Sequence, residues 1–270
     1  MTTPLDGAGI IGNTVSVKGT FTHAGNKETG VTVNGVMALI SRNEFTADHV
    51  PLLSGENTIT ARATDVSGAF MADSITVQAD TSGDYIELTA DPVSGMAPFE
   101  TTLRIDGPFD FAVSDITYTG PGTAEFLESG RDQYRVRLSA RGIYTFTATV
   151  TDAQGYSYTD SMSVEVVDEA AIDGLLKQKW LGMKAALNSG DIEGALTFIA
   201  DGGREMYAYN FELLRPYLPE ISAGLNNITL VNIIDGEAKY YMVGEQGGQT
   251  YSFYVLFIKG PDGIWRIRFF

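Results

Sequence analysis

Apolar and polar residues alternate along one stretch of the chain that occurs twice. Residues 147–166 read TATVTDAQGYSYTDSMSVEV, and residues 60–79 read TARATDVSGAFMADSITVQA. In both copies the alternation flanks an Asp-x-x-Gly segment, where the aspartate can accept hydrogen bonds from turn amides and the glycine tolerates a positive φ. The pattern predicts one β-hairpin that is used in two consecutive modules.

Other strand-like runs accompany the first copy. Residues 1–9 are expected to be a lead-in segment before the first strand. Short runs bounded by Gly, Asn, Ser and Asp are typical of a β-sandwich. They cover residues 15–21, 31–40, 44–47, 57–63 and 70–77. Residues 1–80 are therefore predicted to form the first sandwich.

Three turns in this first module match a known pattern. They are Asn34-Gly35, Gly55-Glu56-Asn57 and Asp65-x-x-Gly68. With the strands between them, they resemble bacterial immunoglobulin-like modules of the kind found as the B domain of glucodextranase. The resemblance implies a non-catalytic spacer or interaction module.

A polar linker at residues 80–84 leads to a second module, residues 84–168. This module resembles a PKD-type domain at its two ends, which implies another β-sandwich of a kind frequent in secreted and surface proteins. The matching residues are Ala90-Asp91-Pro92, Gly95, Ala97-Pro98 and Gly142-x-Tyr144-Thr145. Where that family has a Trp-Asp-Phe-Gly-Asp-Gly core, residues 116–122 read ITYTGPG, and Tyr118 is expected to replace the tryptophan.

After residue 168 the apolar period changes from two to about 3.6, which is typical of amphipathic helices. Asn188-Ser189-Gly190 ends the first helix, and Asp191 is expected to cap the second. Pro216 and Pro219 are expected to bend or interrupt a third helical stretch. The predicted apolar faces hold Ile172, Leu175, Leu176, Trp180, Met183, Leu187, Ala195, Leu196, Ile199, Tyr207, Phe211, Leu214, Leu218, Ile221 and Leu225.

Four strands are predicted to complete the chain, at residues 227–234, 237–245, 249–259 and 263–270. The turn signals between them are Asp235-Gly236, Gly247-Gly248 and Pro261-Asp262-Gly263. Helices followed by such an antiparallel meander indicate an α+β domain, residues 170–270. The order of elements, with Trp180 on the first helix and the ending DGIWRI, resembles the nuclear-transport-factor or SnoaL-like cone. The predicted fold is thus multidomain, with two all-β immunoglobulin-like sandwiches followed by an α+β cone.

Composition restricts the chemistry. The 270 residues carry a formal charge of −16 and include no cysteine. An acidic surface repels phosphate backbones, so nucleic acid is not an expected partner. Without cysteine the chain has no disulfide, thiolate metal site or cysteine nucleophile. No apolar run approaches the roughly 20 residues of a membrane-spanning helix. The module types favour an extracellular, cell-surface or periplasmic protein whose export signal is absent from this chain.

The two histidines, His23 and His49, both lie in the first module and are expected in loops. The last module therefore has no histidine for acid–base work, and no catalytic constellation is visible. In that module, Asp201, Arg204, Tyr207 and Tyr209 are candidate ligand-pocket residues, with Glu205 beside them. The same aromatic residues are equally explained as core.

The strand at residues 249–259 has two apolar faces. One face carries Phe253, Val255 and Phe257, and the other carries Tyr254, Leu256 and Ile258. The first is predicted to pack on the helices. The second is predicted to form an interface, which includes a possible homodimer through the C-terminal sheet.

Four aspartates are weak calcium candidates: Asp65, Asp73 and their repeat counterparts Asp152 and Asp160. Calcium prefers oxygen ligands, but hydrogen bonding within the Asp-x-x-Gly turns explains the turn aspartates equally well. No other cofactor or metal is expected.

The leading interpretation is a non-catalytic exported modular protein, in which two immunoglobulin-like spacers present a C-terminal cone-fold domain for recognition of a protein or a ligand. One alternative is a small-molecule-binding protein or enzyme that uses the C-terminal pocket. Another is a carbohydrate- or surface-binding module based on the PKD-like domain. The expected partner is a protein or a surface polysaccharide.

Overall fold

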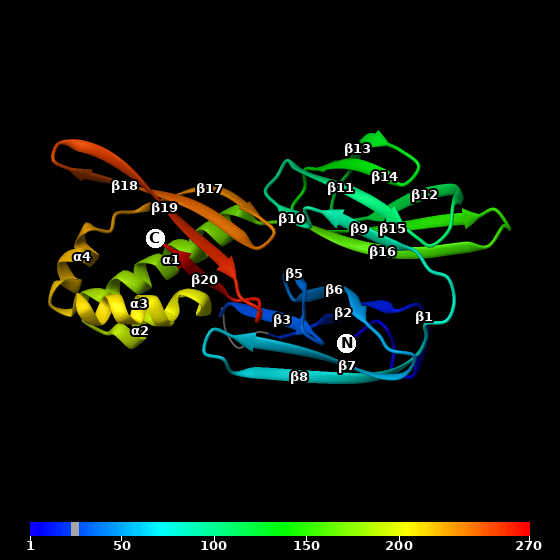
Figure 1. Ribbon diagram of the computed structural model, residues 1–270, viewed down its shortest axis with the longest axis horizontal. Coiled ribbons are helices and arrows are strands. Elements are labelled where there is room, and N and C mark those ends of the chain that lie inside the picture. The colour runs from blue at the N-terminus through cyan, green and yellow to red at the C-terminus, as the bar shows by residue number, and fades with distance from the viewer. Residues whose placement is uncertain (23–26) are drawn as a thin grey trace. The chain divides into compact units, whose positions relative to one another are not determined.

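A computed structural model describes residues 1–22 and 27–270 (Figure 1). The chain divides into two compact units. The first comprises residues 1–167 with 261–264, and the second comprises residues 168–260 with 265–270. Both copies of the repeated hairpin lie in the first unit, and all the helices of the described residues lie in the second.

The first sandwich consists of two sheets whose strand orders are β1-β8-β7-β3-β4 and β2-β6-β5. Apolar side chains from both sheets, Val17, Val33, Ile59 and Val77 among them, form one buried core. The bounds are β1 Ala8–Ile11, β2 Thr14–Thr20, β3 Thr29–Val33, β4 Val36–Met37, β5 Leu39–Ser41, β6 Glu44–Pro51, β7 Gly55–Asp65 and β8 Phe70–Asp80. This arrangement confirms the predicted immunoglobulin-like sandwich.

Two details differ from the sequence-based expectation. The first nine residues are not merely a lead-in, because Thr3 forms a bridge with Lys18 and β1 pairs in parallel with β8. The run at residues 31–40 is also not one strand. Asn34 and Gly35 adopt positive φ values of 47° and 87°, which reverse the chain between β3 and β4.

The second sandwich also has two facing sheets. They are β13-β14-β11-β9 and a sheet that contains β12-β15-β16-β10. The ring of Tyr118 lies 6.4 Å from that of Phe126 and 5.8 Å from that of Phe146, within an aromatic core. The bounds are β9 Glu87–Asp91, β10 Ser94–Gly95, β11 Phe99–Asp106, β12 Phe111–Thr119, β13 Ala124–Ser129, β14 Gln133–Leu138, β15 Gly142–Asp152 and β16 Ser157–Val166. The PKD resemblance itself stays a prediction.

The repeated sequence forms the same hairpin twice, as β7–β8 and β15–β16. In the first copy, the Asp65 carboxylate accepts the N–H groups of Ser67 and Ala69 at 2.8 and 3.2 Å. In the second copy, Asp152 accepts the N–H groups of residues 154 and 156 at 2.9 and 2.8 Å. The turn glycines have φ values of 83° and 90°. The hairpin prediction is confirmed in both modules.

The second unit begins with helices. They are α1 Glu169–Asn188, α2 Ile192–Leu196, α3 Asp201–Leu213 and α4 Leu218–Gly224, with a 3-10 turn, η1 Arg215–Tyr217, before α4. Asp191 caps α2 as predicted, since its carboxylate accepts the N–H of Gly194 at 2.9 Å. Pro216 lies in η1, where the third helical stretch is interrupted.

An antiparallel meander completes the second unit. It comprises β17 Ile228–Ile234, β18 Glu237–Gln246, β19 Gln249–Lys259 and β20 Trp265–Phe269. The segment between α2 and α3 pairs with β20, because the N–H of Ala200 donates to the carbonyl of Ile267 at 2.8 Å. The predicted order of helices and strands is present, and the cone assignment stays a prediction.

Aromatic side chains join the helices to this sheet. The Trp180 ring meets the Phe270 ring edge-on at 5.3 Å, and Tyr207 stacks on Phe270 at 5.1 Å. The indole N–H of Trp180 donates to the carbonyl of Asn226 at 2.9 Å. Trp180 and Trp265 are 1% and 4% exposed, which confirms their predicted core positions.

We expect Trp180→Ala to destabilise the second unit by about 3–5 kcal/mol, because it leaves a large cavity beside Phe270. Both tryptophans of the chain lie in this unit, so the fluorescence of Trp265 during urea unfolding reports its stability. Leu181→Ala, at a neighbouring exposed position, is the matched control and should cost less than about 1 kcal/mol. Equal midpoints for Trp180→Ala and the wild type would contradict this packing.

Candidate functional site

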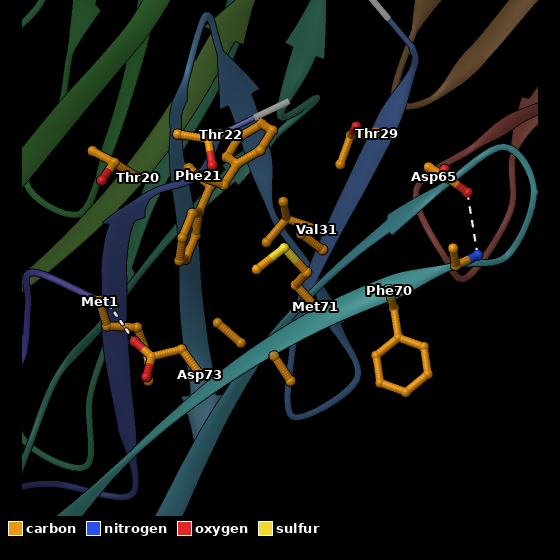
Figure 2. Close-up of a pocket in the computed structure, with 15 residues that line it drawn as sticks. Met1, Thr20, Phe21, Thr22, Thr29, Val31, Asp65, Phe70, Met71 and Asp73 are labelled. Carbon is orange, nitrogen blue, oxygen red and sulfur yellow. Dashed lines mark hydrogen bonds and ion pairs between the residues drawn. The ribbon is translucent and has the colours of Figure 1, made fainter. Parts of the chain in front are cut away.

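The first sandwich contains a cavity of about 410 Å³ (Figure 2). β7 and β8 have 11 residues each, whereas the facing strands β2, β6 and β5 have seven, eight and three. Within residues 1–22 and 27–270, the facing sheet is therefore shorter than the hairpin. The cavity is lined by Met1, Thr20, Phe21, Thr22, Thr29, Val31, Phe45, Ala61, Ala63, Asp65, Ala69, Phe70, Met71, Ala72 and Asp73.

Met71 is the apolar side chain that β8 contributes to this cavity. Val77 is buried in the core, and counting back in twos places Met71 on the same inner face of the strand. Figure 2 shows Met71 directed toward Val31, whereas Phe70 points away. On the outer face, the guanidinium of Arg62 lies 3.7 Å from the centroid of the Phe70 ring. Met71 is 75% exposed and Phe70 is 56% exposed, so two adjacent apolar residues face opposite sides.

Two carboxylates stand at the rim of the cavity. Asp73 lies 2.8 Å from the ammonium group of Met1, and this hydrogen bond lowers the pKa of Asp73. A hydrogen bond from the Ser67 hydroxyl lowers the pKa of Asp65, and Lys27 lies 3.9 Å away. Both carboxylates are therefore ionised at neutral pH. The site combines an apolar interior with an acidic rim, which suits a ligand that has an apolar group next to a cation.

A second polar cluster lies within the first unit, where β5 and β6 contact β15 and β16. The Nε2 of His49 is 3.1 Å from the carboxylate of Asp160, and its Nδ1 is 3.8 Å from that of Glu87. Asp160 also accepts the N–H of Leu88 at 2.7 Å. His49 was expected in a loop, but it belongs to β6, where its φ of 53° accompanies an irregular register against β2. His23 lies outside the described residues.

Asp48 adds to the same inter-sandwich contact. It accepts the Ser16 hydroxyl at 2.7 Å and the N–H of Ser163 at 2.9 Å. The hydrogen bond to Asp160 and the negative charges nearby raise the pKa of His49, against the opposing effect of burial. Because Ser16 binds Asp48 and His49 binds Asp160, these residues do not form a serine–histidine nucleophile pair.

The candidate pocket residues of the second unit have separate environments. Asp201 and Arg204 form an ion pair at 3.0 Å, and Arg204 also donates to the carbonyl of Ile199. Tyr207 is buried against Phe270, and burial raises the pKa of its phenol. Tyr209 is 70% exposed. A cavity of about 310 Å³ in this unit is lined by other residues, namely Lys177, Trp180, Leu181, Asn227 and Ile228.

Sequence reasoning missed a buried tyrosine in this unit, Tyr240. The hydroxyl of Tyr240 donates to Asp173 at 3.1 Å, and the ammonium group of Lys177 is 2.7 Å from the other oxygen of that carboxylate. Burial raises the pKa of Tyr240, which keeps its phenol protonated. The spacing of Asp173 and Lys177 by four residues on a helix was the available signal.

The predicted interface residues lie on β19. Tyr254 is 72% exposed, and Leu256 and Ile258 are half-buried. On the opposite face, Val255 and Phe257 are buried as predicted, whereas Phe253 is 47% exposed, so the prediction that it packs on the helices is wrong. Within a single chain, this apolar face is therefore incompletely covered.

The calcium candidates have different partners. Asp65 and Asp152 bind the amides of their own turns, Asp73 binds the N-terminal ammonium and Asp160 binds His49. Among the residues that the structure describes, no group of three or more His, Asp or Glu side chains is arranged to hold a metal ion. In the same residues, no helix is long and apolar enough to cross a bilayer.

No protein-family model and no curated protein matches this chain. Among solved structures, it is similar to the fibronectin(III)-like modules of Clostridium thermocellum CbhA, with 15% identity over 61% of this chain and 92% of that chain, and a TM-score of 0.23. It is also similar to the protocadherin GammaB4 extracellular domain, with 14% identity over 60% of this chain and 31% of that chain, and a TM-score of 0.25. A third similar structure is SGBP-B of the Bacteroides ovatus mixed-linkage glucan utilization locus, with 15% identity over 62% of this chain and 45% of that chain, and a TM-score of 0.21. The chain spans less than half the length of the latter two. At such low TM-scores, the assignment of immunoglobulin-like sandwiches rests on the sheets themselves.

We expect the pKa of His49 to lie above 6.5, because Asp160 stabilises the imidazolium. The resulting stabilisation is fully present below pH 6.5 and is lost as the pH rises through the folded-state pKa. His23→Gln leaves one imidazole for titration by nuclear magnetic resonance. In that background Asp160→Asn should lower the pKa markedly, and Glu87→Gln should lower it less. A titration that is insensitive to Asp160→Asn would contradict the observed pairing.

Proposed function

We propose that this chain is a non-catalytic modular protein that recognises a protein partner, and that the cavity of the first sandwich is its recognition site. The observation that carries this proposal is the uncovered end of the β7–β8 hairpin, which leaves Met71 exposed beside an apolar cavity. Exposed apolar concavities with a few polar groups at the rim are the usual form of binding sites. Methionine adapts its shape to different apolar groups.

The arrangement of the titratable groups supports a role in binding over one in catalysis. His49 is paired with Asp160 between the two sandwiches, and Ser16 is paired with Asp48. In the second unit, Tyr240 is held as a buried phenol by Asp173. These pairs join elements of the fold and, among residues 1–22 and 27–270, do not place a nucleophile beside a general base.

We assign the second sandwich to PKD-like modules and the C-terminal domain to cone-like folds. The position of Tyr118 in the aromatic core supports the first assignment. The order of α1–α4 before β17–β20 supports the second. The corresponding domains are residues 1–80, 84–168 and 170–270. Modules of these types favour a secreted or surface location.

Nile red, a neutral apolar dye, tests the cavity. We expect the whole chain to bind it with enhanced fluorescence. Met71→Asp should reduce the affinity about tenfold or more, because it places a charge in the apolar cavity. Leu53→Asp, which places the same charge at an exposed apolar position of the first module outside the cavity lining, is the matched control and should bind like the wild type. Equal binding by both variants would overturn the proposed site.

The outer face of the C-terminal sheet is a second proposed recognition surface. Tyr254 is 72% exposed and lies opposite Tyr241 on β18, and Val243 and Phe269 are also exposed. If this face joins two copies, light scattering should give twice the 29.1 kDa chain mass. Tyr254→Asp with Leu256→Asp should then restore the monomer without loss of folding. A wild-type monomer at high concentration would exclude the homodimer.

A further inference from the structure

An unpaired strand edge adjoins the cavity of the first sandwich. β8 pairs with β7 along its whole length, but on its other side β1 covers only Val77–Asp80. Within residues 1–22 and 27–270, no strand lies beside residues 70–75 on that side. The first five residues of β8 are also exposed. An exposed strand edge of this kind offers a template for another strand.

The backbone groups of this edge point outward at alternate residues. The N–H of Gly7 donates to the carbonyl of Thr76, and the N–H of Thr76 donates to the Asp6 carboxylate. Both backbone groups of Thr76 therefore face away from β7. Because this direction recurs every second residue, Ala72 and Phe70 direct their N–H and C=O groups the same way. In the described part of the chain, nothing pairs with them there.

We propose that this edge binds an extended segment of a basic partner protein by strand addition, so that one apolar side chain of the segment enters the cavity beside Met71. The proposal rests on the recognition role proposed for that cavity and names the form of its partner. In strand addition, main-chain hydrogen bonds supply affinity and pockets for alternate side chains supply specificity. Here the edge and the pocket share four residues of β8, Phe70 to Asp73.

The charge at this edge favours a basic segment. Asp73 lies on the inner face of β8, two residues from Met71 and next to the cavity. An added strand would lie about 4.8 Å away, with inner-facing side chains about 6.8 Å apart, so neighbouring side chains would meet Met71 and Asp73. Asp73 accepts the N–H of Ser74 and is paired with the Met1 ammonium group at 2.8 Å, which a lysine of the added segment would have to displace.

The same carboxylate disfavours a second copy of this chain as the occupant. Edge-to-edge pairing of two β8 strands would bring two Asp73 side chains together on the inner face. Inward-pointing charges on edge strands are a common protection against self-association. The formal charge of −16 per chain adds long-range repulsion between copies, whereas it attracts a basic partner.

A short synthetic peptide tests this proposal on the whole chain. Every second residue of the peptide is threonine, and the residues between them, which would face inward, are valine and lysine. In the control peptide, glutamate replaces each lysine. We expect fluorescence anisotropy to show binding of the lysine peptide only, with stronger binding at low salt. Hydrogen exchange of the Phe70 and Ala72 amides should slow in the complex. Failure of the lysine peptide to bind, or equal binding of both peptides, would overturn the proposal.

Ala72→Pro removes one outward N–H, which an edge strand tolerates. We expect it to weaken peptide binding about tenfold, whereas Ala72→Val, which keeps the N–H, should bind like the wild type. Ala72 also lines the cavity, so Nile red binding is compared between the two variants and should be equal in them. Loss of peptide binding by Ala72→Pro alone, with equal dye binding by the two variants, supports strand addition. Equal peptide binding by the two variants overturns strand addition but leaves the cavity function intact. If Met71→Asp binds the dye as well as the wild type does, the cavity function itself is overturned.

Two N-methylated peptides make the test independent of the folding of any variant. Methyl groups are placed on alternate backbone nitrogens, in one register or in the other. Since an added strand uses only one of its edges, one register should abolish binding to the wild type and the other should preserve it. Equal effects of both registers would contradict strand addition. Chain dimerisation that Ala72→Pro abolishes would show that a second copy covers the edge and would also overturn the proposal.

Discussion

The β7–β8 hairpin is longer than the sheet that faces it, and this difference in length creates the principal features of the first sandwich. Where the facing strands are present, Ile59 and Val77 are fully buried. Beyond them the same alternation continues, and within residues 1–22 and 27–270 Met71 remains exposed beside a cavity. The unpaired edge arises in the same way, because β1 pairs only with the far end of β8. Strand length, more than any special residue, thus places a pocket beside an open strand edge.

The two copies of the repeated hairpin use equivalent positions differently. Asp65 and Asp152 perform the same task, since each binds the amides of its own turn. Asp73 and Asp160 also correspond, but Asp73 lies at the exposed cavity, whereas Asp160 binds His49 and the N–H of Leu88 at the contact between the sandwiches. A carboxylate at an exposed strand edge, here paired with the Met1 ammonium group, can exchange that cation for one from a partner. The same carboxylate with a histidine and an amide as partners holds two modules together.

Local sequence patterns predicted most of the elements, because turn chemistry and periodicity act over a few residues. The Asp-x-x-Gly turns, the Asp191 cap, the interruption at Pro216 and the C-terminal meander all follow from such signals. The pairing of β1 with β8 and the contact of His49 with Asp160 do not, since their partners lie about 70 and 111 residues away. The cavity was missed because it depends on the relative lengths of two sheets, which no single stretch encodes.

The acidic surface and the open edge are linked by a requirement for selectivity. A neutral sandwich with five exposed residues at a strand edge would pair with its own copies, since backbone hydrogen bonding does not distinguish partners. Asp73 on the inner face and the net charge of −16 oppose that pairing, while the apolar cavity retains an attraction for a side chain of suitable size. A basic segment with an apolar side chain is attracted both by the negative charge and by the cavity. The charge that prevents self-association therefore also selects the partner that the edge accepts.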